Sequence, residues 1–184
     1  MDVVYTQPLK ELLAVASYFK EKVVVLVENE RDERVARQNN LIPCYLVNDK
    51  TDLQKVVGKK KAVLGGSIKD NEFAVRVKAD FLLQPSNVKQ FFDLGLAKKL
   101  ADNNSIVVLM LEELLKANSF ERHLYWKNYV EVVNYCRIKK TKFIVASGCK
   151  DPLHLRPKKT REALATILGL PCGLAKQYLD EEVE

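Results

Sequence analysis

Residues 106–146 read IVVLMLEELLKANSFERHLYWKNYVEVVNYCRIKKTKFIVA, and this stretch decides the fold class. It begins with the apolar run at 106–111 and ends with the apolar run Lys142–Ala146, and an amphipathic segment separates the two. Apolar runs without alternation are typical of strands that are covered on both faces, as in parallel sheets. A strand, a helix and a second strand form one β-α-β unit, so the stretch predicts an α/β protein with a mainly parallel sheet.

The segment between the two runs has the signals of one long helix. Asn118 followed by Glu121 is close to a capping box, which marks a helix start. Apolar side chains then recur at spacings of four, three and four, in Tyr125, Tyr129, Val132 and Cys136. The helix is expected to run to about residue 138, with Tyr125 and Tyr129 in the core rather than stacked on a ligand.

Similar short apolar runs occur upstream of this stretch. We expect strands at 3–5, Val23–Val27, 41–47, 62–64 and 80–83, which makes about seven in all. Helical patterns alternate with them: one begins at Pro8, two cover 32–37 and 71–77, and one capped by Ser86 or Asn87 extends to Leu100. Two more helices are expected at 159–168 and from Pro171.

This alternation predicts a degenerate β/α (TIM-like) barrel of about seven mainly parallel strands with covering helices and a helical C-terminus. A doubly wound open sheet is the alternative. A standard eight-fold barrel takes about 250 residues, so a barrel of 184 residues must have short helices. One domain over residues 1–184 is expected.

Composition argues against several classes of protein. Apolar residues make up 47% and charged residues 29%, as in ordinary globular proteins. No apolar run approaches the length of a membrane span, and the N-terminus has no signal-peptide pattern, so we expect a cytoplasmic protein with no membrane association. The four cysteines form no C-x-x-C pair, and there are only two histidines, which argues against a zinc site.

A search for catalytic motifs finds little. The pair Gly65-Gly66 follows a strand and is interpreted as a tight turn, because it completes no phosphate-binding loop. His123 and His154 have no second ligand at metal-binding spacing. A nucleophile at Ser147 or Cys149 has no supporting motif, although 146–149 end a strand, where barrels place their sites. We therefore expect no catalytic residue, no metal and no cofactor bound by the protein.

The distribution of charge gives the positive signal. The net charge is +6, but residues 122–161 alone contain eleven Lys or Arg and two acids, so that segment is +9 and the remainder −3. Such a basic segment is typical of a surface that binds a polyanion, or is simply a solvated lysine-rich face. The cations that we expect to contact RNA phosphates are Arg122, Lys139, Lys140, Lys142, Lys150, Arg156, Lys158 and Lys159. Arg122 has the alternative of pairing with Glu112.

Several elements of the second half occur in a fixed order and spacing. They are IVVLM (Ile106–Met110), Leu114-Leu115, NSFER (118–122), KFIVASG (142–148), Leu155-Arg156 before a proline, LATILGL (164–170), and a final helix with Ala175. The strand with a proline at 79–85, ADFLLQP, belongs to the same set. Over residues 60–179 this set resembles the barrel-type protein subunit of archaeal ribonuclease P, known as protein component 3.

The resemblance implies a β/α barrel related to PHP-type metal-dependent phosphoesterases. It also implies an RNA-binding accessory role in a holoenzyme whose RNA, with magnesium on the RNA, removes the 5′ leader from precursor tRNA. The implied partners are ribonuclease P RNA, precursor tRNA indirectly, and a second, smaller protein subunit. Of the predicted RNA contacts, Arg122 and Arg156 fall on matching elements.

Two other functions stay open. PHP phosphoesterases hold their metals with several histidines, starting from a His-x-His pair on the first strand, and here the first strand region is DVVYT. A stand-alone phosphoesterase-type enzyme is therefore disfavoured, since the fold alone does not establish the activity. A scaffold that contacts only proteins is the other alternative, and an exposed apolar patch would support it.

Overall fold

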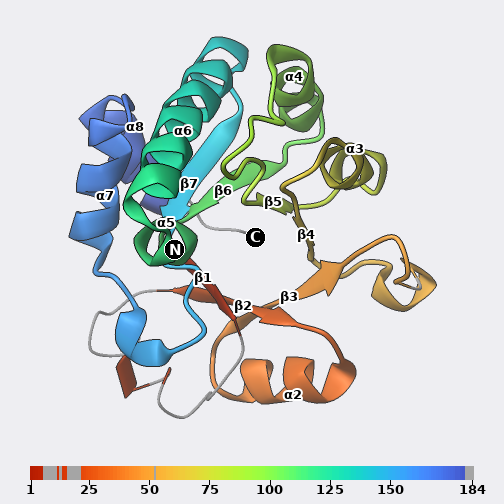
Figure 1. Ribbon diagram of the computed structural model, residues 1–184. Coiled ribbons are helices and arrows are strands. Elements are labelled where there is room, and N and C mark those ends of the chain that lie inside the picture. The colour runs from red at the N-terminus through yellow and green to blue at the C-terminus, as the bar shows by residue number, and fades with distance from the viewer. Residues whose placement is uncertain (6–11, 13, 16–21, 52, 181–184) are drawn as a thin grey trace.

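The computed structural model describes residues 1–184 except 6–11, 13, 16–21, 52 and 181–184. Its centre is a sheet of seven parallel strands that follow one another in chain order (Figure 1). The strands are β1 (Asp2–Tyr5), β2 (Val23–Val27), β3 (Ile42–Val47), β4 (Lys61–Leu64), β5 (Phe81–Leu83), β6 (Ile106–Met110) and β7 (Lys142–Ala146). Each pairs in parallel with the next. The predicted parallel α/β sheet is confirmed.

Backbone hydrogen bonds also join the two edges of this sheet. The Gly148 amide donates to the Val3 carbonyl at 3.0 Å, and the Tyr5 amide donates to the Cys149 carbonyl at 3.1 Å. Gly148 has a φ of 62°, and a Cβ there would lie 2.7 Å from the Cβ of Met110, so this junction requires glycine. The strands form a nearly closed TIM-like barrel, as predicted, rather than a doubly wound open sheet.

A buried polar cluster reinforces the junction between β1 and β7. The Asp2 carboxylate accepts hydrogen bonds from the Ser147 amide at 2.7 Å and from the Ser147 hydroxyl at 2.6 Å. Arg161, from α7 (Lys158–Ile167), lies 3.6 Å from the same carboxylate and donates to the Met1 carbonyl at 2.6 Å. Asp2 and Arg161 are both fully buried. Buried charges are stable only when paired and hydrogen-bonded, so the cluster holds β1 in place.

The alternation of side chains along each strand separates two cores. One face of every strand points into the barrel, as with Val24 and Leu26 in β2 or Val108 and Met110 in β6, and these residues form a compact inner core. The other face packs under the helices and belongs to a larger outer core. Both faces are covered, which explains why the strands are continuous apolar runs.

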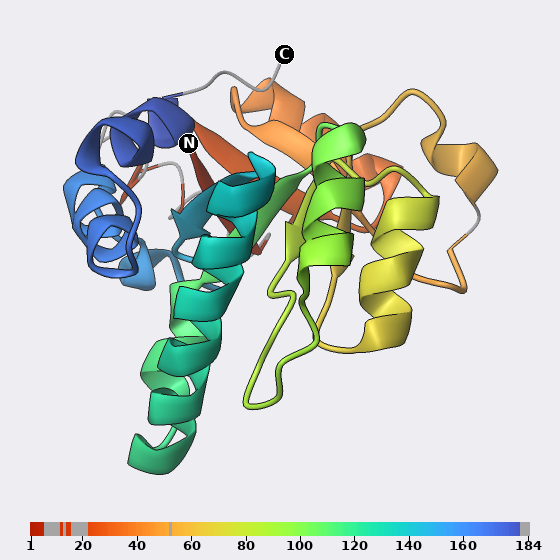
Figure 2. The same ribbon diagram turned by 90° about the horizontal axis from the view of Figure 1, so that it is seen from above.

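Helices surround the barrel (Figure 1). They are α2 (Glu30–Gln38), α3 (Ile68–Arg76), α4 (Leu94–Asp102), α5 (Leu111–Lys116), α6 (Ser119–Lys139), α7 and α8 (Cys172–Asp180), with short 3-10 turns at Leu53–Val56 and Pro152–His154. The amino-terminal half of α6 and the loop at 84–93 extend beyond the strands in Figure 2. None of the helices in the described residues has both the length and the apolar character that a membrane crossing requires.

Two predicted element bounds need correction. The helix after β5 begins at Leu94 with Asp93 as its N-cap, not after Ser86 or Asn87. Residues 84–93 instead form a loop. The Asn71 side-chain amide donates to the carbonyls of Pro85 and Phe91, and these hydrogen bonds to a distant residue replace helical ones. Residue 111, predicted to end a strand, begins the short helix α5. The helix predicted from Pro8 falls largely on residues outside the described part of the chain.

Four helix-to-strand connections share one backbone feature. Asn40, Lys78, Asn104 and Lys140 follow α2, α3, α4 and α6 within two residues and have φ values of 57°, 49°, 57° and 57°. This left-handed conformation costs an ordinary residue about 1–2 kcal/mol, and glycine or asparagine is the usual occupant. An exposed cation gains only about 0.3–1 kcal/mol from the helix dipole. Lys78 and Lys140 are thus less stable choices than glycine.

Candidate nucleic-acid interface

The barrel places the eight predicted RNA-binding cations at two opposite ends. All strands are parallel, so one end of the barrel contains every amino end of a strand and the other end every carboxyl end. Residues 150–159 follow β7 and lie at the carboxyl end, whereas residues 139–142 begin β7 and lie at the amino end. Arg122 is at the start of α6, which projects past the carboxyl end (Figure 2). The contiguous basic segment is therefore not one patch.

Acidic side chains lie among the predicted RNA-binding cations at the carboxyl end of the barrel. The buried Glu112 carboxylate accepts a hydrogen bond from the Lys150 amide at 2.9 Å, pairs with Lys116, and lies 3.8 Å from Nδ1 of His154. Lys158 lies 3.7 Å from Glu162. This end has mixed charge, since its cations are set among carboxylates of the same chain.

Lys150 contacts an aromatic ring at this end, and Arg156 borders a cavity. The Lys150 ammonium lies 5.4 Å from the centre of the Tyr5 ring, a cation–π contact. The Arg156 amide donates to the Ser147 hydroxyl at 2.8 Å, and the Arg156 side chain lines a cavity of about 210 Å³ with Glu112 and His154. The cavity combines a carboxylate, an imidazole and a guanidinium, a set that suits a small anion or a proton transfer.

Arg122 has a structural role, with partners that the sequence did not predict. Its guanidinium donates to the carbonyls of Leu115 and Ala117, at 3.2 and 2.9 Å, at the end of α5. Such donation satisfies carbonyls that the end of a helix leaves without partners. The alternative pairing of Arg122 with Glu112 is wrong, because Glu112 pairs with Lys116.

The amino-end group lies in a turn without acids. Residues 137–142 read RIKKTK, and Lys140 in the left-handed position is exposed. The Thr141 hydroxyl is buried and donates to the Ala97 carbonyl at 2.8 Å, which ties this turn to α4. Sequence reasoning missed that Lys59–Lys61 and Lys78 reach the same end of the barrel. The only signal available was the run of three lysines at 59–61.

The candidate nucleophiles are held in the closure of the barrel. Ser147 is buried, its hydroxyl donates to Asp2 and accepts from the Arg156 amide, and neither partner is a histidine. Burial, with Asp2 and Glu112 nearby, raises the pKa of the buried Cys149 thiol to about 12, so it stays protonated at neutral pH. In the described residues, no group of three or more His, Cys, Asp or Glu side chains could hold a metal ion.

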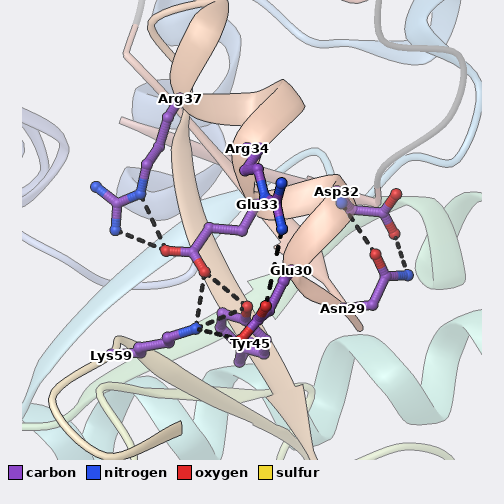
Figure 3. A network of polar contacts seen from close by, with 8 residues as sticks. All are labelled: Asn29, Glu30, Asp32, Glu33, Arg34, Arg37, Tyr45 and Lys59. Carbon is purple, nitrogen blue, oxygen red and sulfur yellow. Dashed lines mark hydrogen bonds and ion pairs between the residues drawn. The ribbon is translucent and has the colours of Figure 1, made fainter. Parts of the chain in front are cut away.

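A second polar network lies beside β3, at α2 (Figure 3). The Tyr45 hydroxyl and the Lys59 ammonium donate to the Glu33 carboxylate at 2.7 and 2.9 Å, and Arg37 donates to its other oxygen. These donors, the Tyr45 hydroxyl first, lower the pKa of Glu33 to about 2. The network joins α2, β3 and the 57–61 turn, and Tyr45 also lines a neighbouring cavity of about 790 Å³.

Another cavity, of about 610 Å³, lies between the 84–93 loop and the α5–α6 region. Lys89, Lys116, Glu113 and Glu121 line it together with Tyr125. Tyr125 and Tyr129 pack edge to face, Tyr129 is fully buried, and Tyr125 and Trp126 pack against the outer core. The expectation that Tyr129 belongs to the core is confirmed.

The chain is similar in fold to solved structures. A chain in a cryo-EM structure of archaeal ribonuclease P with mature tRNA superposes with a TM-score of 0.76 at 15% identity, covering 96% of this chain and 87% of that one. A crystal structure of an uncharacterized protein gives a TM-score of 0.50 at 11% identity over 92% of this chain and 47% of the other. No protein-family model and no curated protein sequence matches. The chain thus has the barrel fold that the sequence resemblance implied, in nearly its full length.

Proposed function

We propose that this chain is an RNA-binding accessory protein subunit of ribonuclease P that supports RNA-catalysed removal of the 5′ leader from precursor tRNA. One observation supports this above all: the fold matches, over 96% of the chain, a chain from an archaeal ribonuclease P assembly with tRNA. The ordered sequence elements over residues 60–179 point to the same family independently of that superposition.

In this role the protein neutralises phosphates and the RNA performs the hydrolysis. Lysine and arginine side chains release counterions from an RNA backbone when they bind it. The eight cations Arg122, Lys139, Lys140, Lys142, Lys150, Arg156, Lys158 and Lys159 are the proposed contacts. Ser147 and Cys149 supply no activated nucleophile in the described geometry, and magnesium belongs to the RNA. A second, smaller protein subunit is the proposed protein partner, in the cytoplasm.

Reconstitution tests the proposal directly. Cleavage of precursor tRNA by ribonuclease P RNA would be measured at modest magnesium with the partner subunit, with and without this protein, and with this protein alone. The expected result is faster cleavage only when the RNA is present, with a smaller gain at high magnesium, which shields phosphates by itself. No gain at any magnesium concentration would contradict the proposal.

A protein scaffold is a second candidate, and exposed apolar side chains favour it. Leu115, Phe120 and Leu153 are 51%, 72% and 76% exposed, and all three follow the carboxyl ends of β6 and β7. Exposed apolar patches commonly mark protein contacts. If the partner subunit bound this chain while the complex showed no protection of the RNA, the scaffold role would replace RNA binding.

A phosphoesterase-type enzyme is a third candidate, and the 210 Å³ cavity with Glu112 and His154 is the feature that speaks for it. The test is metal-dependent turnover of a model phosphodiester by the protein alone, and its loss in His154→Ala. Turnover that is absent in the unaltered protein would remove this candidate.

A further inference from the structure

Charge is distributed unequally between the two ends of the barrel. Among the described residues, the connections at the amino ends of the strands (22, 37–41, 57–61, 76–80, 101–105 and 137–142) contain eleven Lys or Arg and two acids, and one of these cations, Lys59, pairs with Glu33. The connections at the carboxyl ends (28–33, 48–51, 65–72, 84–93, 111–122 and 147–159) contain ten Lys or Arg and twelve acids. A polyanion is therefore attracted more strongly to the first surface than to the second.

Helix dipoles explain part of this difference. Acids are favoured at helix starts and bases in the last turn, where Arg37, Arg76 and Arg137 lie. They do not explain Lys78 and Lys140, which are exposed and occupy left-handed positions where the backbone cost exceeds the gain from the dipole. The equivalent turns have Asn40 and Asn104, a residue type that tolerates this conformation. The two lysines therefore need a reason other than stability.

Hydrogen bonds show that the lysine turns are neighbours. The Lys61 ammonium donates to the Val77 carbonyl at 2.9 Å, next to Lys78. Asn103 donates to the Val75 carbonyl at 3.0 Å and connects that turn to the end of α4. The Thr141 hydroxyl binds the same helix, next to Lys140. The turns before β5, β6 and β7 thus form one rim, across which adjacent strands are only about 5 Å apart.

We propose that the amino end of the barrel, with Lys78 and Lys140 in its rim, makes the main contacts to the RNA phosphates. This assignment rests on the proposed function and gives it a surface. It places the RNA at the end opposite to the one where barrels of this kind build their sites. Lys139 and Lys142 extend the rim along β7, and Lys60 and Lys61 extend it along β4.

Glycine at the two left-handed positions separates RNA binding from stability. In Lys78→Gly/Lys140→Gly the backbone strain is relieved while two charges are lost, so the protein is expected to melt roughly 2–4 °C higher and to bind RNA more weakly. The matched control is Asn40→Gly/Asn104→Gly, which makes the same backbone change without changing charge. It is expected to melt no lower than the unaltered protein and to keep its RNA affinity.

Affinity would be measured with the full-length proteins and a labelled ribonuclease P RNA transcript, from 0.05 to 0.3 M KCl. The lysine variant is expected to lose on the order of fivefold to tenfold in affinity for each lysine at 0.1 M salt, and its slope of log K against log salt is expected to fall by about 2.

Two results would overturn the assignment in different ways. If Lys78→Gly/Lys140→Gly keeps the affinity and slope while Lys150→Ala/Arg156→Ala/Lys159→Ala loses them, the RNA lies at the carboxyl end and only this assignment fails. If the unaltered protein shows no salt-dependent binding to the transcript, the proposed function fails together with it.

Discussion

At the residue scale, Arg161 supports the closure of the barrel between β1 and β7. Its guanidinium is fully buried between the Asp2 carboxylate and the Met1 carbonyl. Arg161→Met keeps much of the side-chain volume but leaves Asp2 as a buried charge without its cation, which costs about 3–5 kcal/mol. We expect this loss in the free energy of unfolding, measured by urea denaturation. Asp2→Asn/Arg161→Met should recover part of it, and an additive double variant would contradict the pairing.

Glu33 is expected to make stability depend on acid pH. Its pKa of about 2 in the folded protein lies below the ordinary value, so its hydrogen bonds stabilise the fold above about pH 5 and this contribution is lost as the pH falls towards 2. Hydrogen bonds to a charged group contribute about 1–2 kcal/mol here. Thermal melts of Glu33→Gln and of the unaltered protein should differ at pH 7 and converge near pH 2. A difference that is constant with pH would contradict the assignment.

At the element scale, α6 is anchored by a cap that the sequence already indicated. The Asn118 side chain accepts a hydrogen bond from the Glu121 amide at 3.0 Å, and the helix then extends for 21 residues. Asn118→Ala should lower the free energy of unfolding by about 1 kcal/mol. Circular dichroism melts measure this, with Asn118→Ser as the control that keeps a capping oxygen. Equal stability of the two variants would show that the cap contributes nothing.

Local patterns predicted strands better than helix starts. The β7 bounds match the prediction because a covered strand is apolar at every position, a signal contained in a few adjacent residues. The start of α4 was misplaced because Val88, Phe91 and Phe92 have helical spacing, whereas the loop there is held by Asn71 and by Asn128, whose amide donates to the Asn87 carbonyl. No local pattern reports hydrogen bonds to residues so distant in sequence.

At the scale of the whole molecule, the candidate site could be predicted only in part. The basic character of residues 122–161 was readable, but the barrel divides that segment, because β7 crosses from one end to the other between Lys142 and Lys150. Lys78 joins the basic end from a different part of the chain, and only the fold brings it there. A sequence pattern shows which segments are basic. The position of the basic surface depends on which turns the fold brings together.

This division gives a test of the two ends. Lys139→Ala/Lys140→Ala/Lys142→Ala removes three cations from the amino end, so the salt slope of RNA binding is expected to fall by about 3. Filter binding at several salt concentrations measures it, and a melting curve checks that the fold is intact. If RNA affinity and its salt dependence are unchanged, these lysines are not phosphate contacts.

The hydrogen bonds between Asp2 and Ser147 join residues that are 145 positions apart in the sequence. During synthesis on a ribosome, the contacts of the first strand with Arg161 can form only after Arg161 has left the exit tunnel. Until then the nascent sheet has two open edges, each able to pair with a neighbouring nascent chain. Protein made from a message truncated before codon 161 is therefore expected to need chaperones, because the barrel becomes protected from aggregation only after Arg161 has been synthesised.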